Sequence, residues 1–114
     1  DFLMNGQELA TAAQYGATML VLAVDNGAYG TIRMHQEREY PGRVSATQLS
    51  NTDFAALGEA YGARSARVET TQEFSAALAE AQTRKGLRLI HIVIDVEQLA
   101  ASGATISGLR LKTP

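Results

Sequence analysis

The chain contains no cysteine and no tryptophan, and it has only two prolines and two histidines. The absence of cysteine excludes disulfides, thiolate nucleophiles and zinc sites with cysteine ligands, and it fits a reducing compartment. The histidines, His35 and His91, lie too far apart for a zinc pair on one helix. The sequence therefore has to fold around an apolar core alone.

A strong charge of either sign is also missing. Twelve acidic and 10 basic residues give a net charge of −2, so no positive field favours nucleic acid or an anionic membrane surface as a partner. The strongest apolar run, Thr18 to Val24, is too short to span a membrane, and no leader-like segment opens the chain. With 114 residues, 46% of them apolar, we expect one cytoplasmic domain with a real core.

The first residues, Asp1-Phe2-Leu3-Met4, include no initiator methionine and no polar lead-in. We therefore expect residues 1–114 to be a single, truncated domain of a longer chain.

Apolar patterning predicts alternating helices and strands along the chain. Asn5, Asn51 and Thr70 are predicted to cap helices, and Glu8 and Glu73 complete capping-box spacings after Asn5 and Thr70. Helices are expected at 6–15, at 28–36, between Asn51 and Gly62, and between Thr70 and Gly86. Strands are expected at 18–24, 63–68 and 87–94. Residues 37–50 are expected to form a loop, and a short helical turn near 97–101 is expected to precede a tail.

Such alternation with short connections predicts an α/β fold, with an open, mainly parallel sheet and helices on both of its faces. The run from Thr18 to Val24 is apolar at both parities, which indicates a strand covered on both faces.

The candidate site is V-L-A-V-D-N-G-A-Y-G, from Val21 to Gly30, where an apolar strand ends in polar residues. In open α/β sheets, ligands bind outside the carboxyl ends of the strands. Asp25 and Asn26 offer the hard oxygens that Mg²⁺ or Ca²⁺ prefers, and the amides that open the next helix can face an anion. A metal-bridged phosphate is one interpretation; an ordinary turn, in which Asn26 caps the next helix, is the other.

Three segments together carry a resemblance: D-F-L-M-N-G-Q-E-L-A-T-A, then V-L-A-V-D-N-G-A-Y-G-T-I-R-M, then D-F-A-A-L-G-E-A-Y-G-A. They resemble the C-terminal, diphosphate-binding domain of thiamine-diphosphate-dependent enzymes of the acetolactate synthase and pyruvate decarboxylase superfamily, from Asp1 to about Asp95. In that family a Gly-Asp-Gly opens the cofactor motif and an Asn-Asn pair closes it. Here Asp25-Asn26 stands at the close, and a Gly-Asp-Gly directly before Asp1 would give an interval like the family's.

The resemblance implies that the Asn26 side chain and the Ala28 carbonyl are magnesium ligands. It further implies that the surrounding residues bind thiamine diphosphate, with amides near Tyr29 and Gly30 facing the diphosphate. The implied cofactor-binding residues are Asn26, Gly27, Ala28, Tyr29, Gly30, Thr31 and Ile32, and no catalytic residue is assigned to this segment.

Two positions refine that implication. Asp25 departs from the more frequent Asn, and a second negative charge beside a diphosphate is unfavourable, so we expect Asp25 to hydrogen-bond the backbone. Ile32 stands where pyruvate decarboxylases carry an acidic residue and acetolactate synthases an aliphatic one. This favours a carboligase-like pocket, although helix packing explains Ile32 equally well.

The remaining candidates have plain structural interpretations. His91 is expected to be a core or edge residue, and His35 a solvated helix residue unless it lies at the substrate mouth. Arginines 33, 38 and 43 are expected on a solvated face rather than on a substrate carboxylate.

The resemblance implies a parent enzyme that acts on a 2-oxo acid, built as a dimer or tetramer of three-domain chains, whose activating glutamate comes from a neighbouring subunit. Alone, this segment is then expected neither to bind the cofactor tightly nor to turn over. FAD, which some acetolactate synthase relatives bind in a middle domain, stays open. So do two other classes, a different doubly wound binding module and a non-catalytic scaffold.

Overall fold

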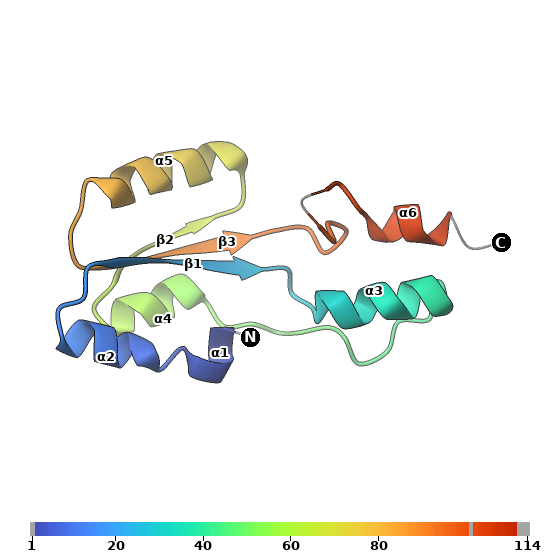
Figure 1. Cartoon of the computed structure of the whole chain (residues 1–114), viewed down its shortest axis with the longest axis horizontal. Helices are drawn as coiled ribbons and strands as arrows, with labels where there is room; N and C mark the ends of the chain where they lie inside the picture. The colour runs from blue at the N-terminus through green and yellow to red at the C-terminus, as the bar shows by residue number, and fades with distance from the viewer. Residues whose placement is uncertain (1, 101, 112–114) are drawn as a thin grey trace. The chain divides into compact units, whose positions relative to one another are not determined.

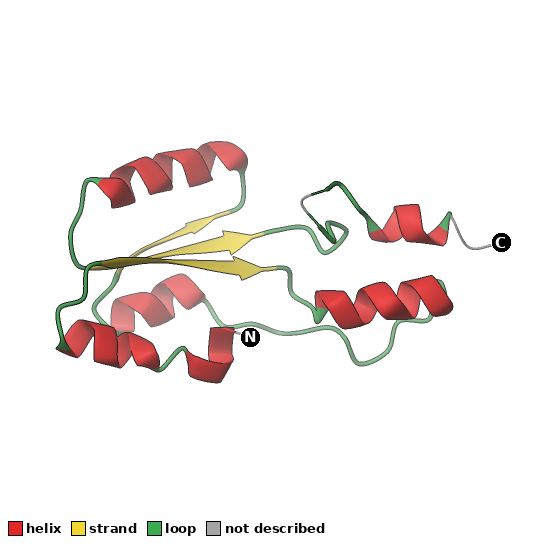
Figure 2. Cartoon of the chain, in the orientation of Figure 1, coloured by secondary structure: helices red, strands yellow, loops and turns green. Residues whose placement is uncertain are grey.

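The structure, a computed structural model, describes residues 2–100 and 102–111. Its described elements, drawn in Figures 1 and 2, are α1 (Phe2–Asn5), α2 (Glu8–Gln14), β1 (Met19–Asp25), α3 (Gly30–Glu39), α4 (Phe54–Ala60), β2 (Arg64–Val68), α5 (Thr71–Gln82), β3 (Leu87–Val93) and α6 (Ile106–Arg110). They fall into two compact units. The first holds described residues 2–24 and 52–93, and the second holds described residues 25–51, 94–100 and 102–111.

The first unit is built on a three-stranded sheet in the order β1-β3-β2. The three strands point the same way in Figure 1, and β2 pairs with β3 in parallel register, from Arg64 opposite Arg88 to Val68 opposite Ile92. Helices lie on both sides of the sheet, with α2 and α4 on one side and α5 on the other (Figure 2). The predicted α/β fold with a parallel sheet is confirmed.

Alternate residues of β3 fill two separate apolar clusters. Leu89, 1% exposed, packs with Leu9 of α2 and Phe54 of α4. Its neighbour Ile90, 2% exposed, packs on the opposite side with Ala81 of α5. This is the two-residue period of a strand that is covered on both faces.

Strand β1 is covered less than its sequence predicts. Leu22 is 48% exposed and Val24 is 61% exposed, so the expectation of two covered faces is wrong for the carboxyl half of this strand. The physical reason is the strand order: β1 is an edge of the described sheet, and α5 packs on β2 and β3.

The helix starts follow local hydrogen bonding. Thr70 and Glu73 form the predicted capping box at α5, with Glu73 N to Thr70 Oγ1 at 3.2 Å and Thr70 N to Glu73 Oε2 at 3.1 Å. The other two predicted caps are wrong. Asn5 is the last residue of α1, and α2 follows Gln7 without a side-chain cap, while Glu8 accepts a hydrogen bond from Thr11.

Helix α4 is capped by Asp53 rather than by Asn51. One carboxylate oxygen of Asp53 accepts hydrogen bonds from the amides of Ala55 and Ala56, at 2.9 and 3.1 Å. These amide bonds lower the pKa of Asp53 below its ordinary value. Asn51 lies two residues before the cap position and has a different partner, described below.

The second unit contains α3 and α6, which pack against each other. Helix α3 begins two residues later and ends three residues later than predicted, just before the Pro41-Gly42 turn. Helix α6 was not predicted. The expected turn near 97–101 appears only as a turn at Val96 and Glu97, and Ala101, like residues 112–114, lies outside the described residues.

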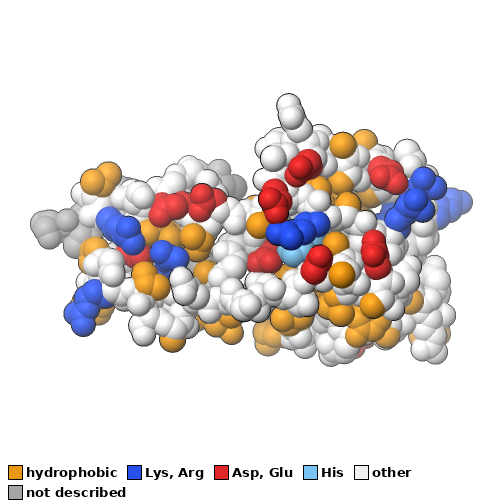
Figure 3. All heavy atoms as spheres, turned by 180° about the vertical axis from the view of Figure 1, so that it is seen from behind, with side chains coloured by type: hydrophobic (Ala, Val, Ile, Leu, Met, Phe, Trp, Pro, Cys, Tyr) orange, Lys and Arg blue, Asp and Glu red, His pale blue; other side chains and the backbone are white. Residues whose placement is uncertain are grey.

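Two surface features complete the description. Among the described residues, no helix is both long enough and apolar enough to cross a bilayer. On the face drawn in Figure 3, acidic and basic side chains are interspersed rather than segregated by sign.

Candidate functional site

The turn that follows β1 is built on the carboxylate of Asp25. Its Oδ1 accepts a hydrogen bond from the amide of Gly27 at 2.9 Å and another from the Asn51 side chain at 2.7 Å. The expected backbone hydrogen bond of Asp25 is therefore confirmed. Asn51, which sequence reasoning assigned to a helix start, instead ties the segment before α4 to this turn.

Asn26 forms the next hydrogen bond of the turn. Its Oδ1 accepts a hydrogen bond from the amide of Ala28 at 3.2 Å, an Asx turn. The alternative in which Asn26 caps α3 is wrong, because the residue before that helix is Tyr29 and no side chain caps it. Gly27 has φ +63°, a backbone conformation that favours glycine.

Gly30 lets the Asn26 side chain lie against the start of α3. A Cβ atom at Gly30 would come within 2.6 Å of Asn26 Nδ2, so any larger residue would push the amide aside. The two glycines of the motif therefore have separate functions: Gly27 permits the turn, and Gly30 makes room for the asparagine.

An antiparallel bridge between Ala28 and Gln48 braces the turn from behind. Tyr29 N donates to the carbonyl of Thr47 at 2.8 Å, and Leu49 N donates to the carbonyl of Gly27, also at 2.8 Å. Thr47 is 2% exposed, so this brace is shielded from water. The backbone of 27–29 is thereby fixed on both sides.

The start of α3 leaves backbone donors available. The first hydrogen bond at this end runs from Arg33 N to the Tyr29 carbonyl at 2.9 Å, so the amides of the first turn have no partner within the helix. Side chains of Asp53, Thr70 and Thr105 cap α4, α5 and α6, whereas no side chain caps α3. An anion at this end would meet both these amides and the positive end of the helix dipole.

The oxygens of the turn suit a hard divalent cation. Asn26 Oδ1 keeps a second lone pair beside its bond to Ala28, and among the described residues none donates a hydrogen bond to the Ala28 carbonyl. The described residues hold no group of three or more His, Cys, Asp or Glu side chains that could bind a metal by themselves. A cation here would share its shell with an anionic ligand, as Mg²⁺ commonly does with phosphates.

The other predicted cofactor residues lie on or near the first turn of α3. Tyr29 is 48% exposed and Ile32 is 54% exposed, and Thr31 is exposed as well. His35, one turn further on, is exposed and contacts Arg38. Its expectation as a solvated helix residue agrees with this placement.

His91 and the arginines fall outside the turn. His91 is 3% exposed, and its ring centroid lies 4.9 Å from that of Phe54, as expected for a core histidine. Arg43 lies over the ring of Tyr40. Arg33 departs from the expected solvated face, because its side chain is only 15% exposed and faces Glu37 at 3.8 Å.

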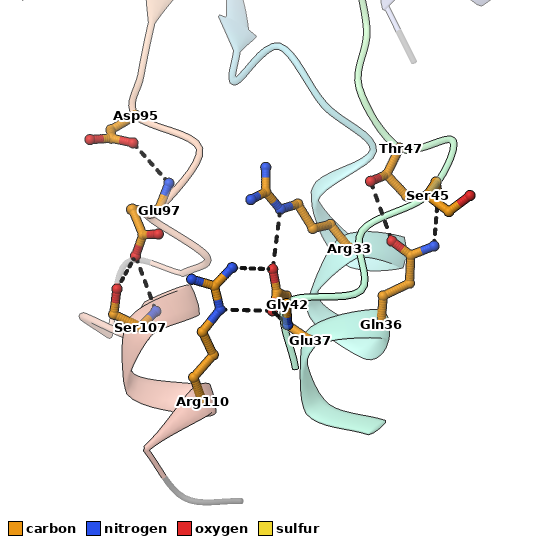
Figure 4. A network of polar contacts seen from close by, with 10 residues as sticks. All are labelled: Arg33, Gln36, Glu37, Gly42, Ser45, Thr47, Asp95, Glu97, Ser107 and Arg110. Carbon is orange, nitrogen blue, oxygen red and sulfur yellow. Dashed lines mark hydrogen bonds and ion pairs between the residues drawn. The ribbon is translucent and has the colours of Figure 1, made fainter. Parts of the chain in front are cut away.

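Sequence reasoning missed a polar network that joins α3, the loop after it and the segment around α6, drawn in Figure 4. Its centre is Glu37, whose side chain has no exposed surface. Hydrogen bonds from Arg110, and then from the amide of Gly42, lower the pKa of Glu37 from 4.5 to about 2. The spacing of Arg33 and Glu37 hints at a helix-surface pair, but no local pattern connects Glu37 to Arg110.

A cavity of about 490 Å³ lies in the first unit, beside β2. Its lining includes Arg64, Ser65, Glu80 and Arg88, and it shares no residue with the turn at 25–32. The candidate site thus rests on the turn itself.

Comparison with known proteins gives three findings. The family described as "Thiamine pyrophosphate enzyme, C-terminal TPP binding domain" matches residues 1–92. The acetolactate synthase large subunit of Haemophilus influenzae is 35% identical over 96 residues, which cover 83% of this chain and 17% of that protein. The 3D-(3,5/4)-trihydroxycyclohexane-1,2-dione hydrolase of Bacillus velezensis is 36% identical over 100 residues, which cover 82% of this chain and 16% of that protein.

A solved structure agrees with these relatives. Benzoylformate decarboxylase from Polynucleobacter necessarius superposes with a TM-score of 0.74 at 32% identity, over 84% of this chain and 18% of that one. The chain therefore spans less than a fifth of the length of each of these three proteins.

Proposed function

We infer a function from the family to which the chain belongs: it is a C-terminal TPP binding domain of the thiamine pyrophosphate enzymes. We propose that the turn after β1 binds the diphosphate of thiamine diphosphate through Mg²⁺. The observation that carries this is the combination of two oxygens with unused acceptor capacity among the described residues, on Asn26 and on the buried Ala28, with a start of α3 that no described side chain caps.

Each residue of the turn has a separate part in this proposal. Asn26 Oδ1 and the Ala28 carbonyl would hold the metal, and the amides at Gly30 and Thr31 would face the phosphate oxygens. The expectation for the Tyr29 amide is wrong, because it donates to the Thr47 carbonyl at 2.8 Å. Gly27 sets the turn and Tyr29 anchors it through Thr47. When bound, thiamine diphosphate supplies the carbanion that attacks a carbonyl substrate, so this chain's own contribution is binding and orientation.

For the reaction we propose an acetolactate synthase-like activity on a 2-oxo acid, decarboxylation followed by carboligation. Two observations support it: the acetolactate synthase relatives, and the aliphatic, half-exposed Ile32 on the first turn of α3. An aliphatic side chain there cannot return a proton to an intermediate, which favours transfer to a second carbonyl compound.

We further propose that the chain functions within a longer protein and an oligomer. The chain spans 17% of the Haemophilus influenzae relative, so most of such a protein lies elsewhere. Its remaining domains and a second subunit would supply the rest of the pocket, including the acid that activates the cofactor, and the turn at 25–32 would supply the diphosphate clamp.

Isothermal titration tests the proposal. Thiamine diphosphate is titrated into the complete protein with and without Mg²⁺, and also into residues 1–114 alone. We expect Mg²⁺-dependent binding by the complete protein and weak binding by the isolated segment. Binding that does not depend on Mg²⁺, or no binding by the complete protein, would contradict the clamp and favour a non-catalytic scaffold; sub-micromolar binding by the segment would contradict the need for other domains.

A further inference from the structure

Glu37 is a buried carboxylate that the proposed function does not use. Its two oxygens accept hydrogen bonds from Arg110 Nε and Nη2 at 2.9 and 2.7 Å, and the amide of Gly42 adds a third at 2.9 Å. Two-pronged pairs of this kind fix orientation as well as charge. Arg110 ends α6, which lies beyond residues 1–92, the part that matches the family.

Helix α6 holds Arg110 in a fixed place despite its five residues. Ile106 has no exposed surface, and Thr105 caps the helix through the amide of Gly108 at 3.0 Å. The carboxylate of Glu97 accepts from Ser107 N at 3.1 Å and from Ser107 Oγ at 2.9 Å, as Figure 4 shows. The arginine therefore projects from an anchored element rather than from a loose tail.

Glu37 is connected to the candidate site through its neighbour Gln36 and the segment 42–47. The adjacent residue, Gln36, donates to the Ser45 carbonyl at 2.8 Å and accepts from Thr47 Oγ1 at 3.3 Å. The backbone carbonyl of Thr47 in turn accepts a hydrogen bond from the amide of Tyr29 at 2.8 Å. Glu37 and Gln36 thus hold the segment 42–47 at both ends, and that segment braces the turn.

We propose that Glu37 and Arg110 are positioning residues, which set the geometry of the turn at 26–29 through the segment 42–47; the identification of what the turn binds rests on the proposed function. Removing Arg110 leaves the buried Glu37 carboxylate with Arg33 alone, at 3.8 Å, and removing Glu37 takes away the acceptor of the Gly42 amide, which anchors the segment. The C-terminal helix then takes part in cofactor binding without touching the cofactor.

Hydrogen exchange in the complete protein, without cofactor, tests the coupling directly. The variants are Glu37→Gln and Arg110→Gln, read by mass spectrometry on peptides that cover Tyr29 and Leu49. We expect exchange at these amides to accelerate at least about tenfold in both variants. Glu69→Gln, which removes an exposed pair with Arg67 at 2.8 Å in the first unit, is the matched control and leaves both peptides unchanged.

Faster exchange at Gly42 with unchanged exchange at Tyr29 and Leu49 would overturn the proposal. If a Gln variant also loses protection in β3, it has unfolded globally, and the result is then taken from Arg110→Lys. This variant keeps the positive charge but cannot form the two parallel hydrogen bonds of the guanidinium. It should therefore give a smaller acceleration of amide exchange, confined to the second unit. No acceleration at Tyr29 in a folded Arg110→Lys protein would overturn the proposal as well.

Affinity separates this inference from the proposed function. In both Gln variants the dissociation constant for thiamine diphosphate with Mg²⁺ should rise at least about tenfold, with partial recovery in Arg110→Lys. If the wild-type protein binds no thiamine diphosphate, the proposed function fails while the exchange result still decides the coupling. Unchanged affinity in variants with accelerated exchange would show that the brace does not serve binding.

Discussion

At the scale of single residues, the site depends on how Asn26 is held. Its carbonyl oxygen is fixed by the amide of Ala28, and its amide nitrogen lies against Gly30, where a side chain would collide with it. The proposed ligand atom would therefore be placed before any cation arrives, which would reduce the entropy lost on binding.

Asn26→Ala should raise the dissociation constant for thiamine diphosphate in the presence of Mg²⁺ at least about tenfold, because it removes a proposed metal ligand. The effect should be small when Mg²⁺ is omitted. Asn5→Ala, at an exposed helix end, is the control. Equal Mg²⁺ dependence in both variants would remove Asn26 from the metal site.

Gly30→Ala tests the same placement without touching a ligand. Alanine is a better helix former than glycine, so the thermal midpoint should stay the same or rise. The new Cβ displaces the Asn26 amide, so the Mg²⁺-dependent affinity should fall several-fold. Glu39→Ala, at the exposed far end of the same helix, should leave the affinity close to that of the wild type; a similar loss there would indicate a general effect of substitution in α3 rather than displacement of Asn26.

Glu37 gives a prediction in pH. Its pKa is lowered to about 2 in the folded protein, mainly by Arg110, so its charged form stabilises the fold above its ordinary pKa of 4.5. That stability is lost as the pH falls from 4.5 towards 2. Glu37→Gln should lower the free energy of unfolding by about 2 kcal/mol at neutral pH. Urea titrations should show the two proteins converging in acid; a gap that is constant with pH would contradict the assigned pKa.

At the scale of elements, the start of α5 was predictable because all of its determinants lie within four residues. Thr70 and Glu73 exchange hydrogen bonds across one helical turn, and the sequence contains both. The start of α4 was not, since Asn51 and Asp53 are both good capping residues. Asp53 caps the helix, whereas the Asn51 side chain is bound to Asp25, which is 26 positions away.

Thr70→Ala should lower the free energy of unfolding by about 1 kcal/mol, because the amide of Glu73 loses its acceptor. Thr71→Ala, one residue inside the helix and exposed, is the matched control. Chemical denaturation measures both. An equal loss in the two variants would indicate a general effect of side-chain truncation rather than loss of the cap.

Helix α6 shows where local reasoning ends. Its segment is rich in alanine, serine and glycine, and five residues are too few to be stable as an isolated helix. It forms because Ile106 is buried and because Arg110 reaches Glu37, a partner 73 positions earlier. The turn of the candidate site could be found from sequence for the opposite reason: the hydrogen bonds from Gly27 N to Asp25 and from Ala28 N to Asn26 each join residues two positions apart.

At the scale of the whole molecule, the order of the strands in the sheet determines which strand is exposed at an edge, and this order could not be predicted from the sequence. The alternation of helices and strands predicts a parallel sheet, but not that β1 is an edge of the described sheet. That position leaves Leu22 and Val24 about half exposed or more. Exposed apolar side chains on an edge strand favour association with other chains.

Val24→Thr should reduce self-association of the isolated 114-residue chain, measured by sedimentation at increasing concentration. Threonine keeps the β-branched shape, so the free energy of unfolding should change by less than about 0.5 kcal/mol. Val68→Thr in β2 is the contrast, because Val68 is 3% exposed. That variant should lose stability without becoming less prone to associate; the reverse pattern would place the contact surface elsewhere.

The paired bonds on Asp25 have a consequence for substitution at this position. Its Oδ1 serves as an acceptor for Gly27 and for Asn51, and an asparagine carbonyl oxygen could accept both of these bonds equally well. Asp25→Asn would therefore keep both bonds and the turn, so the Asp-Asn pair here is compatible with the same backbone as the Asn-Asn pair of the family that the sequence resembles.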